Sequence, residues 1–159
     1  MKVNFINFLP LIYIYVLTTF FTIFLGDYLN LDLEQSISVF LGSFLIFFSV
    51  VKILRLKDFV EAFSEYDFIS KNFKIYAYIF PFLELFFGII FLLFIENIIL
   101  EILCLVLFFV NLISVYLALQ KKRKFLCACL ADIIKLPLSY VSLIENLTLL
   151  LGTLFLLIN

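Results

Sequence analysis

The chain has 159 residues, of which 66% are hydrophobic, 19% aromatic and only 14% charged, and it contains no histidine. A soluble domain of ordinary composition is about 45–50% apolar and about 25% charged. This composition excludes a soluble enzyme, a disordered chain and a basic nucleic-acid-binding face, so no nucleic acid is expected as a partner. The lack of histidine also excludes imidazole bases and histidine-ligated metal sites.

Five stretches approach or exceed the roughly 20 apolar residues that a membrane-spanning helix needs. In chain order they cover residues 5–26, 33–51, 75–95, 97–120 and 136–158. The first is expected to be a retained helix, because its apolar run exceeds the ~7–15 residues of a signal-peptide core and no small-x-small cleavage site follows. The sequence therefore predicts an all-α integral membrane bundle of about five transmembrane helices, forming one domain over residues 1–159.

Residues 56–74 form a connector that is longer than a turn. Asp58 is suited to cap a short helix, and aromatic residues alternate there with acidic ones. This pattern is typical of an amphipathic segment at the membrane interface. The favoured interpretation is a folded connector that lies on its own bundle, and a surface for a partner or substrate is the alternative.

The basic residues occupy only alternate loops. They are Lys2, then Lys52, Arg55, Lys57, Lys71 and Lys74, then Lys121, Lys122, Arg123, Lys124 and Lys135. Because Lys and Arg of short loops mark the cytoplasmic side, the N-terminus is predicted to be cytoplasmic and the C-terminus periplasmic. We therefore expect a multi-pass protein of the bacterial inner membrane, with the lipid bilayer as its surroundings.

Cys127 and Cys129 are the strongest candidates for chemistry. They follow the basic run 121–124, and nearby positive charge favours the reactive thiolate. Two thiols one residue apart could close a strained, labile disulfide, or hold a soft ion such as Cu(I). The third reading is that both are small hydrophobic residues without chemistry, which is the favoured reading for Cys104.

Glu84 and Glu145 are acids deep inside predicted helices. Such carboxylates usually face the bundle interior, where they handle protons or join helices by hydrogen bonds. Glu84 follows Pro81, and Gly88 lies one turn further on, which permits a close helix approach. Lys52 is expected to extend to the interface, with pairing to either acid as the alternative.

The chain resembles the MauE/DoxX superfamily of small membrane proteins, in particular the branch similar to methylamine-utilisation protein MauE. The resemblance rests on residues 47–54, Tyr66-Asp67, 76–78, 81–85, Gly88, 122–124, 127–130, 136–139 and Glu145. It implies a four-helix core with an additional N-terminal helix. The chain departs from the family pattern at Ala131, where glycine is frequent, and at Asn146, where an acid is frequent.

The resemblance also implies a thiol-redox accessory that helps mature the disulfides of a partner protein carrying thiols or disulfides. In this reading Cys127 and Cys129 exchange electrons, while Glu84, Glu145 and Lys52 support proton transfer. Whether the protein is itself a thiol–disulfide oxidoreductase is left open, and no cofactor is predicted. Two alternatives remain: copper binding or transport by the same thiols, and a structural subunit of a quinone-linked complex.

Overall fold

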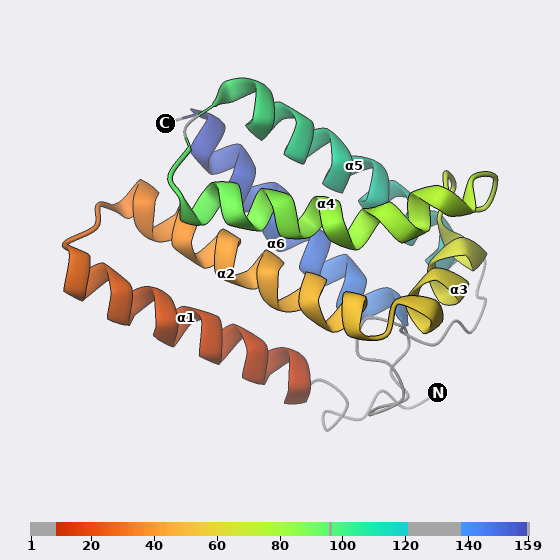
Figure 1. Cartoon of the computed structure of the whole chain (residues 1–159), viewed down its shortest axis with the longest axis horizontal. Coiled ribbons are helices and arrows are strands. Elements are labelled where there is room, and N and C mark those ends of the chain that lie inside the picture. Colours follow the sequence, from red (N-terminus) through yellow and green to blue (C-terminus); the bar gives the residue numbers. More distant parts are fainter. Residues whose placement is uncertain (1–8, 96, 121–137, 159) are drawn as a thin grey trace.

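The computed structural model describes residues 9–95, 97–120 and 138–158, and every regular element in these ranges is a helix. The helices are α1 (Leu9–Leu29), α2 (Leu33–Leu54), α3 (Leu56–Tyr66), α4 (Lys74–Leu92), α5 (Ile98–Gln120) and α6 (Leu138–Ile158). In Figure 1 the five long helices lie roughly side by side, and α3 is at the end where α2 finishes and α4 begins. The predicted all-α bundle is confirmed.

The helix ends differ from the predicted ones by a few residues, for local reasons. α1 continues to Leu29 and stops at Asn30, which has a positive φ of 52°. α4 stops at Leu92, three residues earlier than predicted, because Phe94 has a φ of 51° and the Ile95 amide donates back to the Ile90 carbonyl. Helices commonly end with a residue in this left-handed region, followed by an amide that donates to a carbonyl five residues earlier in the chain.

The tightest helix contact joins α2 and α4 at two glycines. A Cβ atom on Gly42 would lie 2.8 Å from the Gly88 carbonyl oxygen, and a Cβ on Gly88 would lie 3.0 Å from the Gly42 carbonyl oxygen. Neither position has room for a side chain, so the backbones approach directly. The close approach predicted for Gly88 is confirmed, and α2 and α4 form the centre of the bundle (Figure 1).

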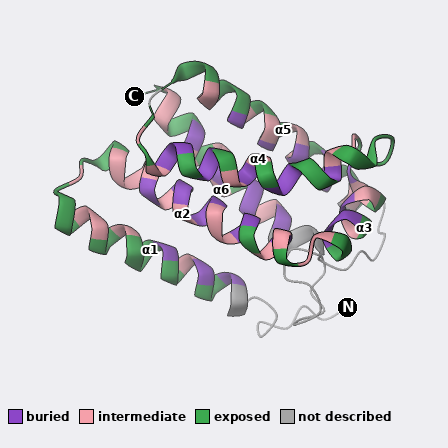
Figure 2. Ribbon diagram, viewed as in Figure 1, coloured by how far each residue is buried: buried purple, intermediate pink, exposed green. Residues whose placement is uncertain are grey.

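The outer faces of the bundle are apolar, as hydrocarbon surroundings require. Large hydrophobic side chains are exposed along all five long helices, and Figure 2 shows exposed residues along the outer sides. Among the described residues, four helices are long and apolar enough to cross a membrane, and the Ser142–Ile158 part of α6 is also apolar. Exposed apolar surface on this scale is incompatible with water but suits lipid. The chain is a multi-pass membrane protein of about five spans.

α3 differs from the other helices because only one of its faces is apolar. Phe59, Val60 and Phe63 are buried against the bundle, whereas Asp58 and Glu61 are exposed. The helix begins at Leu56, so Asp58 lies within its first turn and does not cap it, contrary to the sequence-based expectation. The connector folds back onto α4 and closes one end of the bundle.

A buried ionic centre in the bundle

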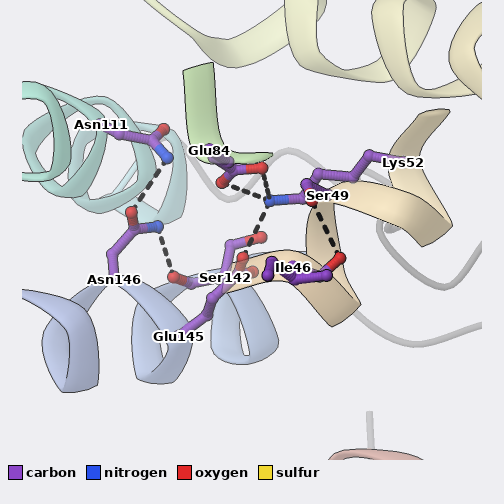
Figure 3. Close-up of polar contacts among 8 residues, drawn as sticks. All are labelled: Ile46, Ser49, Lys52, Glu84, Asn111, Ser142, Glu145 and Asn146. Atoms are coloured by element: carbon purple, nitrogen blue, oxygen red, sulfur yellow. Dashed lines mark hydrogen bonds and ion pairs between the residues drawn. The ribbon is translucent and has the colours of Figure 1, made fainter. Parts of the chain in front are cut away.

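A lysine and two glutamates meet inside the bundle, each from a different helix (Figure 3). The Lys52 Nζ atom of α2 lies 2.6 and 2.8 Å from the two carboxylate oxygens of Glu84 on α4. It also donates to Glu145 Oε1 of α6 at 2.8 Å. All three residues are at most 2% exposed. The ion pairs therefore tie α2, α4 and α6 together in a region shielded from water and lipid.

Aromatic rings surround the ammonium group. The rings of Phe48, Phe59 and Phe80 have their centroids 5.6–5.8 Å from Lys52 Nζ. Ring faces attract a cation within about 6 Å, so these contacts add to the ion pairs. Phe59 comes from α3, and its ring stacks on Phe63 and on Phe80. α3 therefore covers the ionic centre from the end of the bundle.

The position of Lys52 differs from the favoured sequence-based expectation. The sequence favours a side chain that extends from the end of α2 to the membrane interface, with pairing as the alternative. The structure has the paired arrangement, and α2 continues beyond Lys52 to Leu54. A lysine this deep is stable only because two carboxylates and the ring faces replace water around its ammonium group.

A pair of buried asparagines lies next to this centre. Asn111 Nδ2 of α5 donates to Asn146 Oδ1 of α6 at 3.0 Å, and Asn146 Nδ2 donates to the Ser142 carbonyl oxygen at 2.6 Å (Figure 3). Sequence reasoning named Asn146 as a neighbour of Glu145 and as a departure from the family pattern, and it missed Asn111. The signal was available, since an amide in the middle of an apolar span is costly unless it has a partner.

Two more polar contacts hold the surrounding helices. The Tyr15 hydroxyl of α1 hydrogen-bonds to the Thr148 hydroxyl of α6. At the end of α3, Asp67 Oδ2 accepts from the amides of Ile69 and Ser70 and from the Ser70 hydroxyl, at 2.7–3.0 Å. Asp67 therefore fixes the turn that leads from α3 to α4. The sequence analysis placed it in the connector and among the residues of the resemblance, without giving it this role.

Cys127 and Cys129 lie outside the described residues. The third cysteine, Cys104, is completely buried in α5 and contacts Thr153 of α6. Its expected burial is confirmed. Among the residues that the structure describes, no group of three or more acidic or cysteine side chains could hold a metal ion.

The ionic centre contains two acidic groups and one basic group. Two carboxylates face one ammonium group, so the three side chains are neutral together only when one carboxylate also carries a proton. The arrangement is suited to proton transfer, and equally to holding three helices in a fixed register.

Comparison with other proteins gives one match. No curated protein and no solved structure matches the chain. A family model described as "Methylamine utilisation protein MauE" matches residues 14–159, which include α2 to α6 and most of α1. Lys52, Glu84, Glu145 and both cysteines of the pair lie within the matched region. The chain belongs to the MauE family of membrane proteins.

Proposed function

We propose that this protein is a membrane accessory that assists disulfide processing or maturation of a partner protein, with Cys127 and Cys129 as the exchanging pair. Its family is described by a role in methylamine utilisation, which supports a place among the proteins of that process. The observation that carries the proposal furthest is the buried centre of Lys52, Glu84 and Glu145, because a charged cluster is a costly element in a helical membrane bundle.

The position of this centre fits the thiol chemistry. Lys52 lies near the end of α2, and Glu145 lies two turns into α6, at the end of the bundle where α5 finishes and α6 begins (Figure 1). Cys127 and Cys129 belong to the chain segment that joins these two helices. Proton-handling groups are thus built into the same end of the protein from which the cysteine segment starts.

The exchange proceeds in two steps. The thiolate of one cysteine attacks a partner disulfide, so that a mixed disulfide forms and one partner sulfur leaves as a thiolate. The second cysteine then attacks the mixed disulfide, which releases the partner's other sulfur and closes the Cys127–Cys129 disulfide. The partner disulfide gains two electrons and the cysteine pair loses them, and the reverse sequence would oxidise a partner dithiol.

Each step also moves protons, because an attacking thiol must lose one and a leaving thiolate gains one. The carboxylates of Glu84 and Glu145 would accept or return that proton, while Lys52 stabilises the charged form of the centre. This is a supporting role for the three residues, since they do not contact the reacting sulfur atoms in this account.

The distribution of basic residues supports a cytoplasmic location for this end of the protein, in a bacterial inner membrane. Lys57, Lys71 and Lys74 are exposed beside α3. In this orientation the partner's sulfur atoms must reach the cytoplasmic face, or the partner must complete the electron path across the membrane.

The proposal is tested by replacing each cysteine of the pair with serine in cells that require the protein. In the variant that lacks the resolving cysteine, we expect the other cysteine to be trapped in a mixed disulfide with the partner, and with either variant we expect loss of complementation. Cys104→Ser is the matched control and should complement fully. Full complementation by both Cys127→Ser and Cys129→Ser would exclude thiol exchange as the function.

A further inference from the structure

Three buried polar atoms near the closed end of the bundle have no hydrogen-bond partner among the described residues. They are Ser64 Oγ, Asp67 Oδ1 and Asn111 Oδ1. Asp67 is only 1% exposed and Asn111 5%. Buried polar atoms are almost always hydrogen-bonded, and when protein groups do not supply the bond an internal water molecule usually does.

Hydrogen bonds connect the surroundings of Asp67 and Asn111 to neighbouring helices. The amide of Phe68, next to Asp67, donates to Ser114 Oγ of α5 at 3.3 Å. Ser114 is one helical turn from Asn111, which donates to Asn146 on α6. Asn146 directly follows Glu145 of the ionic centre. Polar groups therefore occur at intervals on the connector, on α5 and on α6, and Asn146 is next in sequence to a carboxylate of the ionic centre.

Tyr76 of α4 lies in the same region. Its ring packs against Phe63 and against Phe80, and Phe80 is one of the rings around Lys52.

We propose that Asp67 and Asn111 bind internal water molecules, and that these waters complete a proton path between the Lys52–Glu84–Glu145 centre and the connector after α3. Asp67 is the outer proton carrier of this path, and Asn111 orients water near the centre. No thiol takes part, so the inference stands whether or not the cysteines exchange electrons.

The test measures how fast the centre exchanges protons. The protein is reconstituted in lipid nanodiscs and subjected to a pH jump, and the carboxylic C=O band is followed by infrared spectroscopy. Glu84→Gln and Glu145→Gln assign the band. Asp67→Asn and Asn111→Leu should each slow protonation at least about tenfold, because a positioned proton carrier is worth about 10²–10⁴-fold in rate.

Matched controls separate a proton path from general damage to the fold. Asp58→Asn removes an exposed acid from the same connector and should leave the rate unchanged. Asp67→Glu and Asn111→Ser keep a carboxyl or polar group and should retain most of the rate. If Asp67→Asn does not fold, the protonation rates of Asn111→Leu and Asn111→Ser are compared instead, and a slower rate in Asn111→Leu supports the proton path.

Two results would overturn the inference. One is a protonation rate within about twofold of the wild-type rate in every folded variant of Asp67 and Asn111. Loss of a proton carrier should instead lower the rate by about 10²–10⁴-fold. The other is a C=O band that does not change over the pH range in which the protein is folded. Replacing Cys127 and Cys129 with serine should leave the protonation rate unaltered, so failure of the thiol proposal can be distinguished from failure of the proton path.

Discussion

Lys52 and Glu84 are 32 positions apart in the chain, yet the lysine ammonium contacts both oxygens of the glutamate, at 2.6 and 2.8 Å. This pairing joins the two central helices, α2 and α4, at a point that is shielded from solvent on every side. Glu145 adds α6 to the same contact. The ionic centre therefore links three helices of the bundle through buried charges.

Replacing Lys52 with methionine should strongly destabilise the protein. The substitution leaves two carboxylates buried without a cation, and breaking a buried ion pair from one side costs about 3–5 kcal/mol. Thermal unfolding in detergent measures the loss. Lys57→Met removes an exposed lysine nearby and should change stability by no more than about 0.5 kcal/mol. Equal effects of the two substitutions would contradict the account.

Removing all three charges together should restore much of that stability. In the triple variant Lys52→Met, Glu84→Gln and Glu145→Gln, no charge remains in the ionic centre, and such replacements are often neutral or stabilising. We expect the triple variant to unfold at a higher temperature than Lys52→Met alone. If it is as unstable as the single variant, then packing and not charge explains the loss.

Alanine at Gly88 should separate α2 from α4. Its Cβ would lie 2.8 Å from Ile46 Cγ1 and 3.0 Å from a backbone oxygen of Gly42, so one helix must move. Overpacking of this kind costs about 1–3 kcal/mol. At Gly26 the nearest atom is the Ser36 hydroxyl at 3.6 Å, so Gly26→Ala should gain about 0.5–1 kcal/mol. Unfolding temperatures compare the two, and a stabilised Gly88→Ala would refute the packing.

Loss of the Phe59 ring should open the ionic centre to water. Phe59 is 1% exposed and contributes the α3 side of the aromatic cage around Lys52. We expect Phe59→Ala to cost about 3–5 kcal/mol and to make Lys52 react with an amine-acetylating reagent, as detected by mass spectrometry. Lys57 should react in both proteins.

Phe73→Ala is the matched control for this experiment, because Phe73 is 70% exposed. Lys52 should stay unreactive in that variant. A Lys52 that reacts equally in wild type and in Phe59→Ala would show that α3 does not cover the centre.

The helices could be predicted from the sequence because apolar length sets them directly. The contacts of Lys52 could not, because a single sequence does not specify which helix faces which. A lysine at the end of an apolar stretch can either extend to the interface or be buried. Burial is stable here because Glu84 and Glu145, on two other helices, both pair with Lys52. The partner of Asn111 could not be predicted for the same reason, since Asn146 lies 35 positions away.

Smaller differences arose at helix ends. The predicted end of the third span at residue 95 followed the apolar pattern, but the backbone at Phe94 turns left-handed and ends α4 at Leu92. The apolar pattern continues through this turn because its residues face lipid or pack on the bundle. Hydrophobicity therefore predicts which segment forms a membrane helix better than it predicts the residue at which that helix ends.

The central claim is that Cys127 and Cys129 form a reversible disulfide, and the most direct test is to measure their redox state in cells with a maleimide mass tag. In the Cys104→Ser background, we expect part of the protein to resist the tag until a reductant is added. A membrane-impermeant maleimide should label the thiols only after the cells are opened. Two fully reduced thiols under every growth condition would contradict the claim.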